Sequence, residues 1–151
     1  MSLFYRIALA AEMLGLLVLA RIVTLFPITH WVSAVGFERM NVPQPALRSI
    51  RVVNDTLVYV PGYLEKLSRY VPWRYKCLPV AVACCFALRR RGYAPVLVLG
   101  VRWSGASSEA EKRIEAHAWV EVGGQIVAGR GGALSHLPIS LQYVPLLMSK
   151  L

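Results

Sequence analysis

Acidic residues are scarce in this sequence, which has 8 Asp and Glu against 17 Lys and Arg and therefore a formal net charge of +9. A nucleic-acid-binding protein usually gathers its cations in a stripe with exposed aromatic residues or in a known binding motif. Here the basic residues are spread along the chain, apart from the triplet Arg89–Arg91. We therefore do not expect nucleic acid as a partner, whereas an acidic peptide or a membrane surface fits the charge.

Cysteine is also rare, and three thiols in 151 residues are too few for a disulfide scaffold. If residues 77–91 form one helix, Cys77 and Cys84 lie about 10 Å apart along its axis, beyond disulfide reach. We therefore expect reduced thiols in a cytoplasmic protein. The three histidines show no clustered ligand spacing, so we expect no metal and no other cofactor.

The first 26 residues lack an uninterrupted apolar run of the length that a membrane span needs, because Arg6, Glu12 and Arg21 break it. They also lack a clear signal-peptide cleavage site. We expect a mostly buried helix over 3–25 that packs on the domain or on a partner. Contact of this helix with a membrane surface stays an alternative.

Proline and glycine separate four predicted helices in the first half of the chain: 3–25, 28–36, 46–60 and 63–70. The next run, 77–91, is apolar on all sides until its arginines, which predicts a central, enclosed helix. Pro79 falls in its first turn, where proline is tolerated, and Gly92 follows as a C-terminal cap. The arginines at its end complement the helix dipole.

The hydrophobic pattern then changes to that of strands. Three strands are predicted, the last two joined by a hairpin turn at Gly123-Gly124: 95–103, 115–122 and 125–129. The tail from Gly131 has no clean period. We expect an α+β domain in which an N-terminal helical segment (1–45) precedes a core (46–151), whose cysteine-bearing helix packs on an antiparallel sheet.

Cys77 and His117 are the candidate catalytic pair. Cys77 begins the central helix, and the thiolate, which is the reactive form of cysteine, is favoured at a helix N-terminus beside an imidazolium. His117 lies near the start of the second strand. The alternative is that both are structural residues. Cys84 and Cys85 lie deep in the apolar helix and are expected to be core residues.

A cysteine–histidine pair usually has a third group that orients the imidazole. The only aspartate, Asp55, is far upstream in the helical half. Glu115 and Glu121 are close to His117 in sequence, and strand alternation places both on its face. Either carboxylate is a candidate for the orienting group, and either is equally open to being a solvated surface residue.

Two segments, CLPVAVACCFALRRRGYAPVLVLGVRW from Cys77 and AHAWVEVGGQIV around His117, resemble the lasso-peptide biosynthesis B proteins. The closer resemblance is to their stand-alone B2 leader peptidases, which are transglutaminase-like, papain-related cysteine enzymes. It covers about 72–129 closely, whereas the N-terminal half agrees only in length and helical character. The resemblance implies that Cys77 attacks the peptide bond between the leader and the core of a ribosomal precursor, with His117 as general base and then acid.

The family commonly has an aspartate twelve residues beyond the histidine, and this chain has Gly129 there. The resemblance therefore leaves a backbone carbonyl, Glu121 or Glu115 to orient the ring, or a dyad of Cys77 and His117 alone. It also implies three partners: the leader of the precursor peptide, a separate B1 leader-recognition protein and the macrolactam synthetase known as the C protein. Two alternatives remain, a transglutaminase-type acyltransferase and a non-catalytic, membrane-associated scaffold of the maturation complex.

Overall fold

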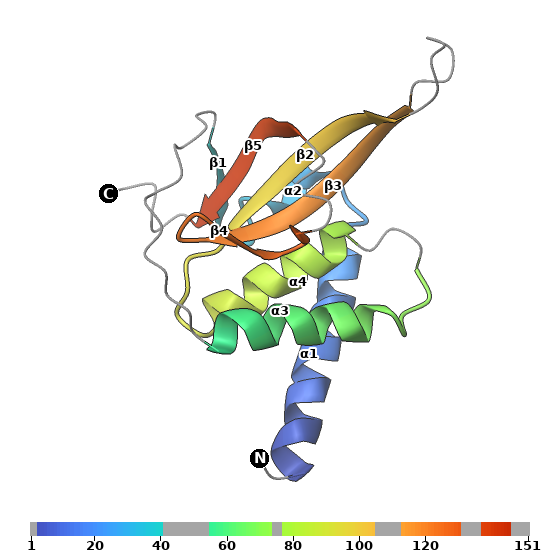
Figure 1. The fold of residues 1–151 in the computed structure, drawn as a ribbon, viewed down its shortest axis with the longest axis vertical. Helices are drawn as coiled ribbons and strands as arrows, with labels where there is room; N and C mark the ends of the chain where they lie inside the picture. The colour runs from blue at the N-terminus through green and yellow to red at the C-terminus, as the bar shows by residue number, and fades with distance from the viewer. Residues whose placement is uncertain (1–2, 41–54, 74–76, 105–112, 131–136, 146–151) are drawn as a thin grey trace.

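The chain folds into a five-stranded antiparallel sheet with helices packed beneath it (Figure 1). The computed structural model describes residues 3–40, 55–73, 77–104, 113–130 and 137–145. Its helices are α1 (Leu3–Val23), α2 (Ile28–Trp31), α3 (Asp55–Ser68) and α4 (Cys77–Arg89). Its strands are β1 (Phe37–Met40), β2 (Val96–Ser104), β3 (Arg113–Val122), β4 (Gln125–Ala128) and β5 (Leu137–Pro145). The predicted α+β class, with a cysteine-bearing helix against an antiparallel sheet, is confirmed.

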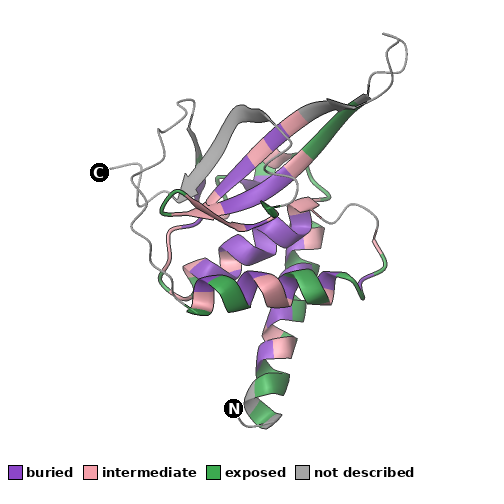
Figure 2. Cartoon of the chain, viewed as in Figure 1, coloured by how far each residue is buried: buried purple, intermediate pink, exposed green. Residues whose placement is uncertain are grey.

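Helix α4 lies at the centre of the domain, as its apolar sequence predicts. It packs against β3 on one side and against α1 and α3 on the others. Almost every side chain from Pro79 to Leu88 is therefore buried, which Figure 2 shows as a nearly continuous purple helix. The helix ends at Arg89, slightly before the predicted end, and Gly92 follows with a φ of 81°. The Gly92 N–H donates to the Arg89 carbonyl at 3.0 Å, as expected of a glycine that caps a helix.

The predicted hairpin joins β3 to β4. Gly123 and Gly124 have φ values of 56° and 76°, the two left-handed conformations that a type I′ turn requires. The register between the two strands shifts between Val120 and Glu121. On its other edge β3 pairs with β2, and this pairing places Gly100 opposite His117. The three predicted strands are thus confirmed, with small differences at their ends.

Helix α3 corrects the prediction of two short helices separated by Pro61-Gly62, because it runs through both residues. Proline inside a helix removes one hydrogen bond and costs about 3 kcal/mol or more. Leu57, Val60 and Leu64 lie on the buried face of α3, which packs on α4 and α1. Each buried side chain of this size contributes about 1.5–3 kcal/mol, so burial outweighs the local cost. The first part of the predicted helix, 46–54, lies outside the described residues.

Two strands of the sheet were not predicted from the sequence. The sheet order is β1-β5-β2-β3-β4, so β5 occupies an interior position although it contains Pro138 and Pro145. Pro145 is the last residue of its strand, and Pro138 lies opposite Gly100, where the register between β2 and β5 shifts. Strand ends and register irregularities are the places where a sheet accepts proline. Strand β1 takes residues beyond Gly36, and the helix predicted over 28–36 is shorter, ending at Trp31.

Helix α1 has one buried and one exposed face, so only part of it packs on the domain, and packing of its other face on a partner stays a prediction. Its buried side chains form part of the core with α3 and α4: Leu9, Met13, Leu16, Leu17 and Ala20. Its opposite face is also apolar but exposed: Phe4, Ile7, Leu14, Val18, Leu19 and Ile22. The first turns extend beyond the rest of the domain (Figure 1). Within the described residues, no helix is both long and apolar enough to cross a membrane.

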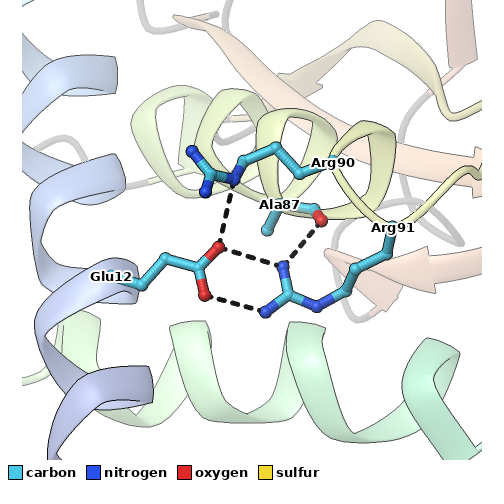
Figure 3. Close-up of polar contacts among 4 residues, drawn as sticks. All are labelled: Glu12, Ala87, Arg90 and Arg91. Carbon is cyan, nitrogen blue, oxygen red and sulfur yellow. Dashed lines mark hydrogen bonds and ion pairs between the residues drawn. The ribbon is translucent and has the colours of Figure 1, made fainter.

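Glu12, the only acidic residue of α1, connects this helix to the C-terminal end of α4 (Figure 3). Arg91 Nη2 donates to Glu12 Oε2 at 2.9 Å, and Arg90 Nε lies 3.3 Å from Glu12 Oε1. Arg91 Nη1 also donates to the Ala87 carbonyl at 2.9 Å. The arginines at the end of α4 therefore satisfy a helix carbonyl and neutralise a half-buried carboxylate at once.

Candidate active site

Cys77 is the first residue of α4, as the sequence predicts. The first amides of a helix have no intrahelical acceptor, and the helix dipole places partial positive charge there. Its side chain is half-buried, and it is a free thiol. A half-buried thiol at the start of a helix, beside amides that lack intrahelical acceptors, is well placed to act as a nucleophile.

Cys84 and Cys85 lie on the same helix but in a different environment, since both are fully buried. Burial, with a smaller contribution from the negative charge of Glu65, raises the pKa of Cys84 to about 12. Burial also raises the pKa of Cys85 well above its usual range. Both thiols are therefore protonated at neutral pH, in agreement with their predicted place in the core.

His117 is half-buried on β3, and its ring is bonded to the backbone at the end of the hairpin. The ring Nε2 lies 3.0 Å from the carbonyl oxygen of Gly129. A carbonyl oxygen only accepts hydrogen bonds, so Nε2 carries the proton and donates it. In the neutral ring, Nδ1 is then the nitrogen with the lone pair, and it is the atom that can take a proton from a nucleophile.

Gly129 has a φ of 74°, a left-handed conformation that suits glycine. A Cβ atom at this position would lie 2.8 Å from the Ala118 carbonyl oxygen and 2.9 Å from Trp119 Cβ. The backbone here runs so close to β3 that there is no room for a side chain. The position where the resembling family carries an aspartate therefore presents a carbonyl group to His117 instead.

Cys77 and His117 line the same pocket, although they are forty residues apart in the sequence. The pocket has a volume of about 180 Å³ and is lined by residues of α3, α4, β3 and the end of the hairpin: Glu65, Ser68, Cys77, Val80, Ala81, His117, Ala118, Ala128 and Gly129. Most of these side chains are small and apolar. The structure thus brings together the two predicted catalytic residues and the residue at the predicted third position.

The two glutamates considered as the orienting group, Glu115 and Glu121, are not among the residues that line the pocket. Glu121 accepts a hydrogen bond from Trp119 Nε1 at 2.9 Å, so its carboxylate is bound to the indole. The indole is stacked beside the His117 imidazole, with ring centroids 6.4 Å apart and an interplanar angle of 20°. Glu121 therefore binds the Trp119 indole, which lies next to the His117 imidazole. Glu115 is exposed on β3 and is not among the residues that line the pocket.

Glu65 and Ser68, both on α3, line the pocket and were not singled out from the sequence. Glu65 Oε1 accepts a hydrogen bond from the Gly129 N–H at 3.3 Å. Ser68 Oγ donates to the Glu65 carbonyl oxygen at 2.8 Å. The sequence predicts both in a short helix, 63–70, that follows Pro61-Gly62, and no motif links this helix to Cys77. Only the packing of α3 on α4 brings them to the site.

In the described part of the chain, no three potential metal ligands lie close enough together to hold an ion. Comparison with protein-family models matches residues 13–140 to the transglutaminase-like superfamily. Because the match spans most of the chain, the protein belongs to this superfamily. The superfamily includes cysteine peptidases and acyltransferases and generally uses cysteine-based catalysis. No curated protein and no solved structure matches the chain.

Proposed function

We propose that this protein is a cysteine peptidase that removes the leader from a lasso-peptide precursor, with Cys77 as nucleophile and His117 as general base and acid. The observation that carries the proposal is that both side chains line one pocket, the cysteine at a helix N-terminus and the histidine with its Nε2 bonded to a carbonyl. The choice of substrate rests on the resemblance of residues 72–129 to the B2 leader peptidases.

The chemistry proceeds in two proton-balanced halves. His117 Nδ1 takes the proton of Cys77 Sγ, and the thiolate attacks the carbonyl carbon of the scissile peptide bond. Collapse of the tetrahedral adduct breaks the C–N bond, and His117 gives its proton to the leaving amine. Water, deprotonated by the same ring nitrogen, then hydrolyses the thioester and restores the thiol. The Cys77 N–H is the proposed first oxyanion donor, since amides at a helix start lack intrahelical acceptors.

In this proposal the Gly129 carbonyl takes the place of the carboxylate that would be the third catalytic group, after the cysteine and the histidine. It fixes the tautomer of His117, because an acceptor at Nε2 keeps the proton there and leaves Nδ1 to act as the base. It brings no full negative charge to stabilise the imidazolium. We therefore expect a slower enzyme than one with an aspartate at this position.

The partners follow from the resemblance alone. The B2 form lacks a leader-recognition domain, so a B1 protein is expected to bind the leader and deliver the junction to the pocket. The macrolactam synthetase would then close the ring on the freed core N-terminus. A peptide delivered in this way needs little binding energy from the pocket itself, which is consistent with its small volume.

The test is mass spectrometry of the cognate precursor incubated with this protein and its B1 partner. We expect a leader fragment and a core with a free N-terminus from the wild type, and a rate at least about 10³-fold lower for Cys77→Ala, as for loss of a covalent nucleophile. Cys84→Ala is the matched control, because it removes a thiol from the same helix at a buried site. It should cleave at close to the wild-type rate.

Two other results would contradict the proposal and favour a different function. A new isopeptide bond to an added amine, with little hydrolysis, would indicate an acyltransferase that uses the same thioester. No reaction of a precursor shown to be bound with B1 would favour a non-catalytic scaffold.

A further inference from the structure

The acidic side chain in the described lining of the pocket is opposite in charge to the protein as a whole. The chain carries a net charge of +9, yet the described residues that line the pocket include one acidic side chain, Glu65, and no lysine or arginine. The other lining side chains are apolar, hydroxyl or thiol groups and the His117 imidazole. A substrate therefore meets a carboxylate at the site where bond cleavage is proposed.

Glu65 is placed to interact with a ligand and with the protein at once. It is exposed, while its Oε1 is held by the Gly129 N–H at 3.3 Å. A carboxylate offers roughly four acceptor positions, so one bond to a backbone amide leaves capacity for a cationic donor. Lys66, exposed on the same helix, and Arg69, exposed directly after its end, do not line the pocket.

The negative charge of Glu65 also acts on α4. It contributes, after burial, to the raised pKa of Cys84, which lies two helical turns from Cys77 on the same helix. An apolar, partly enclosed pocket screens such a charge less than open water does, so its influence on a bound group is larger than at the surface.

We infer that Glu65 makes this pocket selective for a peptide with a lysine or arginine side chain next to the bond that Cys77 attacks. This inference rests on the proposed function and adds the substrate class to it. A cationic side chain would pair with the Glu65 carboxylate, whereas an acidic side chain at the same place would be repelled. The acidic peptide that the overall charge suggests is therefore disfavoured at the pocket itself.

The test measures the charge preference at Cys77 without requiring hydrolysis. Two methanethiosulfonate reagents of similar size, one with a trimethylammonium group and one with a sulfonate, each form a mixed disulfide with the thiolate and release methanesulfinate. We would measure both rate constants at low ionic strength for the wild type and for Glu65→Gln. Taking their ratio cancels differences in ionisation and access of the thiol. Cys77→Ala gives the background from the buried thiols.

Glu65→Gln keeps the side-chain length and a carbonyl oxygen that can accept from Gly129, and it removes only the charge. We expect the cation-to-anion rate ratio to fall about fivefold in this variant, a size typical of one nearby charge. Asp55→Asn is the matched control, because Asp55 is exposed at the start of α3, about 15 Å along the helix from Glu65. Its ratio should stay within about twofold of the wild type.

A structural role of Glu65 gives a different pattern. If Glu65 serves only to hold Gly129, Glu65→Gln leaves the ratio unchanged and Glu65→Ala alters both rates equally, and this result overturns the inference. Cleavage of the precursor without any change in the ratio would likewise overturn it and leave the peptidase proposal standing. A shifted ratio without cleavage of the precursor would support the charge selectivity of the pocket and contradict the peptidase proposal.

Discussion

The two ends of α4 are joined by one apolar segment but lie in opposite environments. At the N-terminal end, Cys77 is half-buried in a pocket and the amides of the first turn lack intrahelical acceptors. At the C-terminal end, the carbonyl of Ala87 and the carboxylate of Glu12 are both bonded to Arg91 (Figure 3). We call the N-terminal end the open end, because it borders the pocket, and the C-terminal end the closed end, because hydrogen bonds and ion pairs occupy it.

The comparison explains why only one of three cysteines on a single helix is a candidate nucleophile. Cys84 and Cys85 are surrounded by the core, and burial keeps them protonated. Cys77, in contrast, is only half-buried and lines the pocket between the sheet, α3 and α4. The position of a thiol along the helix, more than its residue type, therefore decides its reactivity.

Gly129→Ala should have the largest effect on the open end. The new Cβ would lie within 2.9 Å of both the Ala118 carbonyl oxygen and Trp119 Cβ, in a left-handed conformation. We expect a loss on the order of 3 kcal/mol of unfolding free energy, from backbone strain and overpacking together. Movement of the Gly129 carbonyl should also release Nε2 of His117, which ¹⁵N NMR of the imidazole would detect as a change of tautomer.

Gly92→Ala is the control at the closed end. Gly92 has a similar φ of 81°, but a Cβ there would meet nothing within 4 Å. It should lose only about 1 kcal/mol, the cost of the left-handed conformation alone. Equal losses for the two variants in urea unfolding would show that close approach to β3 is not what excludes a side chain from position 129.

The helix carrying Cys77 and the hairpin carrying His117 were predictable because local rules act strongly there. Pro79 in the first turn, Gly92 after the last turn and the Gly123-Gly124 turn each specify a backbone conformation that the structure contains. The continuous apolar sequence of α4 predicts a helix buried on all sides, and its side chains are buried. The division of the chain at residue 45 stays a prediction, and the family match over residues 13–140 runs across it.

The remaining parts depend on contacts between distant segments. β5 has proline at Pro138 and Pro145, and only its pairing with β1 and β2 makes it a strand. Glu65 reaches the pocket through the packing of α3 on α4, and α3 continues through Pro61 for the same reason. The bond from His117 to Gly129 requires the exact approach of two backbones, which side-chain patterns do not encode.

The buried thiols should make the protein less stable in alkaline solution. The pKa of Cys84 in the folded protein is about 12, above the usual value of 9.0 for a cysteine thiol, so the thiol loses its proton at lower pH in the unfolded chain than in the folded one. The stabilisation is fully present below pH 9 and is lost as pH rises from 9 towards 12. We expect a loss of about 1.4 kcal/mol per pH unit from this thiol, measured by urea unfolding between pH 8 and 10.5.

Two single variants make this a comparison along α4. Cys84→Ala should make the alkaline decline of stability about half as steep, because alanine does not titrate while the buried Cys85 still does. Cys77→Ala should leave the decline as steep as in the wild type. A decline that is unchanged in Cys84→Ala would mean that other groups, such as tyrosines or lysines, cause it.

Glu12→Gln tests the closed end and should have the smallest effect. The amide keeps an acceptor for Arg91 but removes the charge that faces two arginines. Since the Glu12 and Arg91 side chains are only 27% and 24% exposed, we expect a loss of about 1 kcal/mol, smaller at high salt. Glu38→Gln, at an exposed carboxylate of β1, should change little. The decisive readout is alkylation of Cys77, which lies about 20 Å away along α4 and should keep its rate. A changed alkylation rate would mean that the arginine contacts set the position of the helix start, and that the two ends of α4 act together.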